Sequence, residues 1–220
     1  MHLLILGGTG PCGLLLIQEA LEAGHTVVVL VRSPQKLPDS MRSDPSITIV
    51  EGQLTDRDTV GKALQGVDAV LSALGPPVKK GIFYPSDTPL AHAYSVVIEV
   101  MKTHGVKRLI ALGTASIKDD HDKHSIVFAA LVSGVAIFAH NAYKDVVAIG
   151  ELIRAQGVNL DSTIVRVPVL TNDAEKAVVA GYIGDGKVKP KLSRAGFASF
   201  SLQQLTSDEW AGKAPLISSP

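Results

Sequence analysis

Three glycines at three-residue spacing, Gly7, Gly10 and Gly13, constrain this chain more than any other feature. The apolar run Leu3–Leu6 precedes them and is typical of a buried parallel strand. The amphipathic run Leu14–Ala23 follows and predicts a helix. A strand, a glycine turn and a helix in this order predict a dinucleotide-binding site, because the glycines permit a tight turn, close approach to a pyrophosphate and close helix packing. An ordinary strand–loop–helix corner is the alternative.

The residues between these glycines fit the start of a helix. Pro11 suits the first helical turn, where no backbone N–H is needed. Such a helix end offers free N–H groups and a positive dipole to a phosphate. Cys12 lies beside it and could carry a thiol of low pKa, although a bound pyrophosphate would cover the thiol and argues against a redox role.

The end of the second predicted strand, Thr26–Val31, indicates which cofactor is bound. An NAD-preferring site carries an acidic residue here for the ribose 2′-hydroxyl, and this chain has none. Arg32, Ser33 and Lys36 instead offer a guanidinium, a hydroxyl and an ammonium, the groups that grip a 2′-phosphate. We therefore expect NADP(H) rather than NAD(H). Solvated surface cations are the alternative.

The composition narrows the class of protein further. The 220 residues fit one α/β domain, and 46% hydrophobic against 19% charged residues supply a core covered on both faces. Lys plus Arg equals Asp plus Glu at 21 each, so the chain lacks the basic excess of a nucleic-acid binder. The single cysteine suits a reducing compartment, and Met1 runs directly into the first strand without a targeting segment. We expect a cytoplasmic protein.

Strands and helices alternate along the chain. Further strands are predicted at Ile47–Glu51, Asp68–Ala73, Arg108–Leu112 and Ser162–Val167, and further helices at Asp56–Leu64, Leu90–His104 and Asn141–Gln156. Residues 78–89, rich in Pro, Gly and Lys, predict a loop. This alternation predicts an α/β fold with a doubly wound parallel sheet (Rossmann) in a single domain, 1–220, with ligands above the carboxyl ends of the strands.

At this level the chain resembles the atypical short-chain dehydrogenases/reductases of the NmrA-like kind, close to the NADPH-dependent biliverdin/flavin reductases. The segments that carry the resemblance are Leu-Gly-Gly-Thr-Gly-Pro-Cys-Gly, Val-Leu-Val-Arg-Ser-Pro-Gln-Lys-Leu, Val-Glu-Gly-Gln-Leu-Thr-Asp, Gly-Val-Asp-Ala-Val-Leu-Ser-Ala-Leu-Gly, His-Gly-Val-Lys-Arg-Leu-Ile-Ala, Thr-Ile-Val-Arg-Val-Pro and Leu-Ser-Arg-Ala. They cover nearly the whole length.

The resemblance implies NADP(H) as the cofactor and a set of residues around it. These are Gly7, Thr9, Gly10, Pro11 and Cys12 at the pyrophosphate, Arg32, Ser33 and Lys36 at the 2′-phosphate, Gln53 and Leu54 at the adenine, Leu74, Gly75 and Pro76 at the ribose, and Val167, Pro168 and Val169 at the nicotinamide. Many relatives have Asp where this chain has Gln53. The family's active-site hydroxyl matches Thr114 best, which would also contact the cofactor, and Ser116 second.

The chain departs from the family in its catalytic pair. Typical short-chain dehydrogenases use Tyr-x-x-x-Lys, in which the lysine lowers the pKa of the tyrosine. Here Tyr143 is followed four residues later by Val147, and Lys144 lies about 100° around the helix. Tyr143 is therefore either a catalytic acid or a residue that lines the pocket. The biliverdin/flavin reductases lack the pair as well, so hydride transfer by positioning alone is open.

The uncharged segment 126–139 is too short to span a bilayer. It is either a buried segment over the end of the sheet, an apolar wall over the nicotinamide, or a membrane-surface or dimer patch. The family places its substrate region after the fifth strand, so we expect a small substrate-binding region from about 113–142 and 167–200.

The remaining polar motifs are interpreted as surface. Lys118–His124 combines His121 and His124 with three carboxylates, but without further ligands a solvated loop is favoured and no metal is expected. Lys187–Lys191 is expected as an exposed turn, and His92 and His104 on a helix surface.

Together these features predict an NADPH-dependent oxidoreductase that transfers hydride to an apolar or aromatic small molecule, resembling a flavin, quinone or carbonyl compound. The alternative is a non-redox NADP-binding protein of the NmrA-like kind, either a redox sensor or an isomerase or cyclase that reuses the fold. The oligomeric state and the substrate's identity are not encoded in a recognisable pattern.

Overall fold

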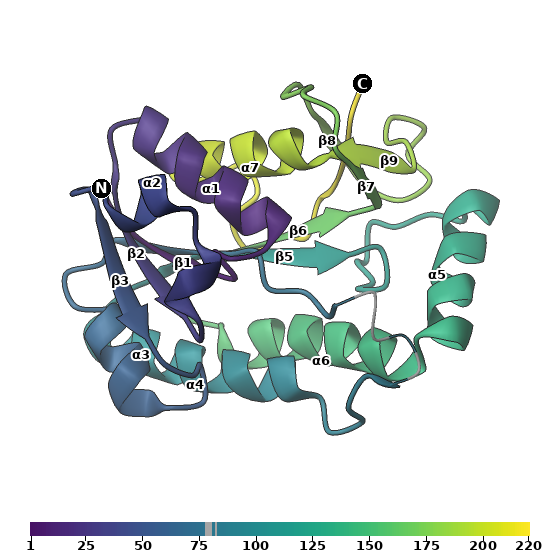
Figure 1. The fold of residues 1–220 in the computed structure, drawn as a ribbon. Coiled ribbons are helices and arrows are strands. Elements are labelled where there is room, and N and C mark those ends of the chain that lie inside the picture. Colours follow the sequence, from purple (N-terminus) through teal and green to yellow (C-terminus); the bar gives the residue numbers. More distant parts are fainter. Residues whose placement is uncertain (78–80, 82) are drawn as a thin grey trace.

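The computed structural model describes residues 1–77, 81 and 83–220 (Figure 1), so part of the loop expected at 78–89 lies outside the described residues. The strands are β1 His2–Leu6, β2 Thr26–Val31, β3 Ile47–Glu51, β4 Ala69–Ser72, β5 Arg108–Thr114, β6 Asp161–Val167, β7 Val169–Thr171, β8 Val179–Gly181, β9 Lys191–Ser193 and β10 Leu216–Ser218. The helices are α1 Pro11–Glu22, α2 Asp39–Arg42, α3 Arg57–Ala63, α4 Pro89–His104, α5 Ile126–Phe138, α6 His140–Gln156 and α7 Arg194–Gln203, with a 3-10 turn at Pro34–Lys36.

One sheet organises the molecule, with strand order β3-β2-β1-β4-β5-β6-β10-β8. Its neighbours pair in parallel except β8, which runs antiparallel to β10 at the edge. The predicted doubly wound fold is confirmed, and the antiparallel edge is an addition to it. The strand order reverses between β1 and β4, and ligands of such sheets bind at this switch point.

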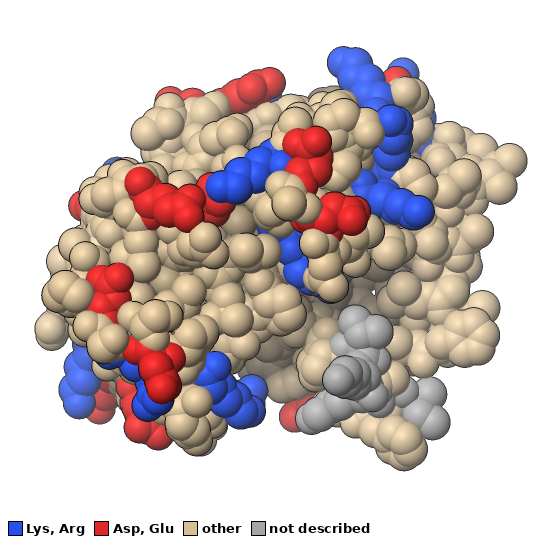
Figure 2. Space-filling model, turned by 45° about the horizontal axis from the view of Figure 1, so that its top comes forward, with Lys and Arg blue, Asp and Glu red and all other residues tan. Residues whose placement is uncertain are grey.

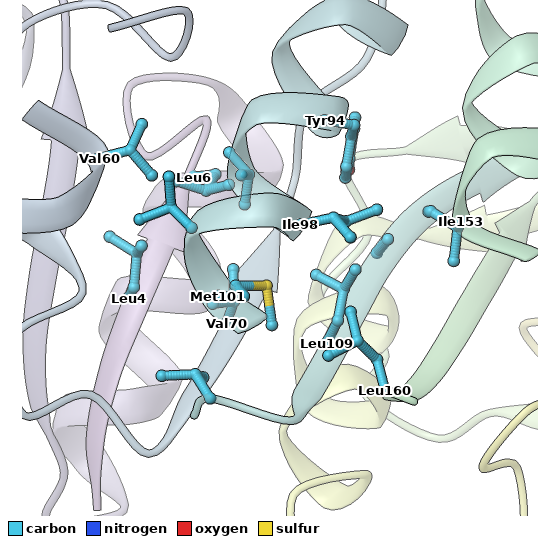
Figure 3. Packing of buried hydrophobic residues seen from close by; sticks show 14 of the residues in the cluster. Leu4, Leu6, Val60, Val70, Tyr94, Ile98, Met101, Leu109, Ile153 and Leu160 are labelled. Atoms are coloured by element: carbon cyan, nitrogen blue, oxygen red, sulfur yellow. The ribbon is translucent and has the colours of Figure 1, made fainter. Parts of the chain in front are cut away.

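Helices cover both faces of the sheet (Figure 1), with α1 and α7 on one face and α3, α4 and α6 on the other. Successive residues of a strand point to opposite faces, so Leu3 and Ile5 pack toward α1 and α7, whereas Leu4 and Leu6 pack toward α3 and α4. Figure 3 shows the second of these layers, where Ile98 and Met101 of α4 lie over Val70 and Leu109 of the sheet.

Proline and glycine mark the ends of α1, whereas a carboxylate from another helix caps α4. Pro11 begins α1, and Gly24, at φ +76°, lies just beyond its end. The N-cap of α4 is Thr88, which has a left-handed backbone at φ +49° and makes no side-chain cap. The carboxylate of Asp145, from α6, caps α4 instead by accepting from the backbone N–H of Leu90 at 3.0 Å and of Ala91 at 2.9 Å.

Burial separates the alternatives for two segments. The segment 126–139 is not a buried cover of the sheet, because within α5 only Phe128 is buried. The loop Lys118–His124 is exposed at five of its seven residues, as expected of a solvated loop, but its Asp119 and Asp122 are half-buried and take part in ion pairs. In sequence alone an apolar helix suggests burial, and α5 does not follow this rule.

Two smaller expectations are confirmed. Lys187 and Lys189 lie in an exposed loop, and His92 and His104 are exposed on α4. In the described part of the chain, no single helix is both long enough and apolar enough to cross a bilayer; α5 and α6 meet that test only together, as a pair bent by 117°.

Candidate functional site

The glycine loop lies at the switch point of the sheet. Gly7 has φ +76°, and a Cβ there would come within 3.0 Å of the backbone of Ala73, at the end of β4. A Cβ on Gly13 would overlap the carbonyl group of Gly7, so α1 packs onto the turn only because residue 13 lacks a side chain. The loops after β1 and β4 are thereby held in contact at the point where the sheet reverses.

The N-terminus of α1 is suited to an anion. Its N-cap, Gly10, makes no side-chain cap among the described residues, and the first helical residue is a proline. A Cβ on Gly10 would meet its nearest neighbour only at 3.4 Å, so the space beside the loop is open. Free N–H groups, the helix dipole and an open approach fit a pyrophosphate.

A cation that the sequence analysis did not predict lies near the glycine loop. The guanidinium of Arg194, the first residue of α7, lies near enough to the thiol of Cys12 to lower the pKa of that thiol. Burial raises the pKa of Cys12, and the guanidinium of Arg194 offsets this only in part, so the expectation of a low-pKa thiol is wrong. Arg194 belongs to the Leu-Ser-Arg-Ala segment, but nothing local to that segment indicates a partner at residue 12.

Arg194 also anchors the connection after β7. Its Nη1 donates to Oδ1 of Asn172 at 2.6 Å, and four residues farther on Lys176 forms ion pairs with Glu19 and Glu22 in the last turn of α1. The connection between β7 and β8 is therefore fastened to the end of α1 and to the start of α7.

The three residues expected at a 2′-phosphate follow β2 directly. Arg32 and Lys36 are exposed and Ser33 is half-buried. Within residues 1–77, 81 and 83–220, neither cation forms an ion pair, in contrast to Arg42 and Arg57, which pair with carboxylates. Two unpaired cations and a hydroxyl at one strand end fit a phosphate group.

The other expected cofactor residues also lie at carboxyl ends of strands. Gln53 and Leu54 follow β3, and the backbone N–H of Leu74 donates to Oγ of Ser72 at 3.3 Å where β4 ends. Gly75 and Pro76 continue this loop, and Pro168 and Val169 follow Val167, the last residue of β6. Thr9 lies in the glycine turn itself.

Ser116 and Tyr143 line one pocket of about 210 Å³ between the segment after β5 and helix α6. Ser116 is buried, and Tyr143 is half-buried in the first turn of α6. Thr114 is the last residue of β5, two residues beyond the predicted end of that strand. Its Oγ1 accepts from the backbone N–H of Ser116 at 3.2 Å, which fixes the turn that carries Ser116.

In this pocket a valine occupies the position of the lysine of the Tyr-x-x-x-Lys pair. Val147 lines it together with Tyr143, one helical turn apart, whereas Lys144 is exposed and is not among the lining residues described. Two cations from other positions, Lys118 and Arg154, line the pocket as well. Nη2 of Arg154 donates to the carbonyl oxygen of Lys118 at 2.6 Å, so the loop is tied to α6.

The histidine-containing loop is a structural junction. No group of three potential metal ligands occurs among the described residues. Asp122 accepts from the buried Arg166, and Asp119 accepts from His121 at 2.9 Å. A larger hollow of about 480 Å³ lies between α3 and the last turns of α4 and is not lined by any residue of the glycine loop.

A doubly wound sheet with a glycine loop at its switch point and an uncapped helix behind that loop defines a Rossmann-fold nucleotide-binding protein. The sequence profile of the NAD(P)H-binding family matches residues 7–208, and the chain belongs to that family. The resemblance to atypical short-chain dehydrogenases/reductases is thereby confirmed.

Solved structures share the whole fold. A short-chain dehydrogenase/reductase from Veillonella parvula in complex with NADP has a TM-score of 0.79 and 14% identity, covering 100% of this chain and 94% of that one. ChuY, an anaerobillin reductase from Escherichia coli O157:H7, has a TM-score of 0.73 and 17% identity, covering 100% and 98%. At these identities the likeness concerns the fold.

Curated relatives match in part. The photosystem II assembly factor Ycf39 of Synechocystis is 40% identical over 73 residues, 33% of this chain and 22% of that protein. The isoflavone reductase homolog P3 of Arabidopsis thaliana is 35% identical over 80 residues, 33% and 26%. An uncharacterized protein of Saccharomyces cerevisiae is 27% identical over 195 residues, 84% and 64%. The chain thus spans less than two thirds of the length of these relatives.

Proposed function

We propose that the protein is an NADPH-dependent reductase that transfers hydride to an apolar or aromatic small molecule of the flavin, quinone or carbonyl kind. The observation that carries the proposal is that Ser116 and Tyr143 share one pocket at the end of β5. This pocket lies on the side of the sheet formed by the carboxyl ends of the strands, where the glycine loop also lies. Reductases among the partial relatives support the same class.

The cofactor would lie along the carboxyl ends of the strands. The pyrophosphate would rest on Gly7, Thr9, Gly10, Pro11, Cys12 and Gly13, the 2′-phosphate on Arg32, Ser33 and Lys36, the adenine by Gln53 and Leu54, the ribose by Leu74, Gly75 and Pro76, and the nicotinamide by Thr114, Val167, Pro168 and Val169. Arg194, whose guanidinium lowers the pKa of Cys12 in this loop, would add a positive charge beside the pyrophosphate.

When bound, NADPH supplies a hydride, which carries two electrons, to an acceptor that also takes up one proton. The Ser116 hydroxyl, held by the turn at Thr114, orients the acceptor, and the Tyr143 hydroxyl donates the proton to the acceptor atom that gains charge. Typical short-chain dehydrogenases place a lysine where this chain has Val147, so we assign most of the rate to positioning of donor and acceptor.

The experiment is stopped-flow oxidation of bound NADPH by a panel of flavins, quinones and aromatic carbonyl compounds, with NADPH carrying deuterium at either face of C4. We expect a primary isotope effect from one face only. Because we assign the proton donor to Tyr143, we expect Tyr143→Phe to lower the rate of hydride transfer by about 10²-fold. Lys144→Gln, on the exposed side of the same turn, serves as the control and should leave the rate unchanged. Tight binding with no oxidation by any acceptor would contradict a reductase and favour the non-redox alternative.

A further inference from the structure

Helix α5 exposes an unusual amount of apolar surface. Ile126 is 77% exposed, Ile137 71% and Phe138 75%. Within its 13 residues there is no charged side chain, and the end of the molecule that carries α5, at the right of Figure 2, shows neither red nor blue. Large exposed apolar patches mark interaction sites.

The exposed residues are not confined to one stripe. The large ones are Ile126, Val127, Val135, Ile137 and Phe138. At 100° per residue these side chains extend over about 180° of the helix circumference. A helix that docks on a protein presents a stripe of roughly 100°, and the seam of a two-stranded coiled coil is narrower. Such a wide apolar surface fits a fluid apolar medium better than the face of one partner.

The charged side chains nearest to α5 in sequence are the cations Lys123 and Lys144, and carboxylates, Asp122 and Asp145, come directly beyond them. From residue 123 to residue 144 the chain contains no Asp or Glu. Lys123 and His124 precede the helix, and His140 and Lys144 follow it, all four exposed. The backbone N–H of Lys123 donates to the carbonyl of Ile183 at 2.7 Å, which brings the 183–187 turn, with the half-buried Asp185 and the exposed Lys187, beside the same end of the helix. An apolar helix between cations is complementary to anionic lipid headgroups over acyl chains.

We propose that α5 binds the surface of a bilayer containing anionic phospholipids, with its apolar sides among the outer acyl chains and its flanking lysines at the headgroups. Thirteen residues at 1.5 Å each give about 20 Å, less than the ~30 Å hydrocarbon core, so α5 lies in the interface and does not span.

Lipid binding would also bring the candidate substrate site to the membrane. In Figure 1, α5 stands at the end where the arrow of β5 points, and the chain leads from β5 through the 115–125 loop into α5. An acceptor dissolved in lipid could then reach the pocket of Ser116 and Tyr143 without crossing water. This consequence rests on the proposed function, whereas the lipid binding itself does not.

The test is flotation of the full chain with phosphatidylcholine vesicles that contain or lack phosphatidylglycerol. We expect the protein to float with the anionic vesicles, and Ile137→Ser with Phe138→Ser to weaken binding at least tenfold, since each residue loses apolar burial. Val158→Ser, at an exposed apolar site in the loop after α6, is the matched control and should float like the wild type. Lys123→Gln with Lys144→Gln should weaken binding to anionic vesicles alone, by about tenfold or more at low salt.

Two results would overturn the proposal. One is no flotation with either vesicle. The other is a stable dimer by light scattering that Ile137→Ser with Phe138→Ser converts to monomer, which would assign α5 to an interface between copies. NADPH titration of the same samples keeps the two proposals apart, because a protein that floats without binding NADPH contradicts the proposed function and leaves lipid binding intact.

Discussion

The guanidinium of Arg166 forms a two-pronged ion pair with the carboxylate of Asp122, with N–O distances of 2.6 Å and 2.8 Å. Arg166 is completely buried in β6 and also donates to the carbonyl oxygens of Ile117 and Ala214. Asp122 in turn accepts from the backbone N–H of Ile183 at 3.0 Å. One pair of side chains thus joins β6, the segment after β5 and the turn after β8.

Removing the carboxylate of this pair should destabilise the fold strongly. We expect Asp122→Ala to lower the free energy of unfolding by about 3–5 kcal/mol, because a buried guanidinium loses its counter-charge. Urea unfolding followed by the fluorescence of Trp210 measures this. The exposed pair Arg57–Glu99 is the control, and Glu99→Ala should leave the unfolding midpoint nearly unchanged. Equal effects of the two substitutions would show that Asp122 has no special role.

The hydroxyl of Tyr84 should make stability depend on alkaline pH. It donates to Oδ2 of Asp145 at 2.6 Å, and burial together with this hydrogen bond raises the pKa of Tyr84 well above its ordinary value. The neutral phenol therefore stabilises the fold below the unfolded-state pKa of about 10, and that contribution is lost as the pH rises above it.

Thermal unfolding between pH 8 and pH 11 checks this sign. We expect the wild-type midpoint to fall more steeply above pH 10 than that of Tyr84→Phe. Tyr94, whose pKa burial also raises, is present in both proteins and contributes equally. Parallel curves would contradict the assignment.

Alanine substitutions at Gly10 and Gly134 distinguish an effect on cofactor affinity from an effect on fold stability. Neither position has a positive φ, and a Cβ on either has no contact closer than 3.4 Å. We expect both Ala variants to unfold near the wild-type temperature. Only Gly10→Ala should lose NADPH affinity, by about tenfold or more, because its methyl group enters the path of the pyrophosphate. Unchanged affinity of Gly10→Ala would move the pyrophosphate away from this loop.

Arg194 should act on the cofactor and on Cys12 together. We expect Arg194→Met to weaken NADPH binding by about tenfold, the size of one charge-assisted hydrogen bond of roughly 1.5 kcal/mol. The same change should raise the pKa of Cys12 further, because the guanidinium is the group that lowers it. Alkylation of the single cysteine as a function of pH reads the second effect. Arg42→Met, on α2, is the control for both.

Much of this fold was predictable because its signals are local. The apolar run Thr26–Val31 matches β2 to the residue, and the helix predicted at Leu90–His104 differs from α4 by one residue at its start. The glycine loop was recognisable for the same reason, since its turn, its strand and its helix are contiguous in sequence.

The rest depends on contacts between distant residues. β8 and β10 are three residues each, too short for a periodic pattern, and their antiparallel pairing is set by the sheet edge. Arg194 lies 182 positions after Cys12, and Asp145 caps a helix that begins 56 positions earlier, so neither role has a local signal. The exposure of α5 could not be read from its composition, because an apolar helix looks the same whether protein or lipid covers it.

The central claim is that this site selects NADPH through its 2′-phosphate. Titration with NADPH and with NADH, followed by energy transfer from Trp210, the only tryptophan of the chain, tests it most directly. We predict that NADPH binds at least about tenfold more tightly and that Arg32→Asp with Lys36→Ser removes this preference without weakening NADH. Equal affinity for the two cofactors, or an NADPH preference that survives the double substitution, would contradict the account.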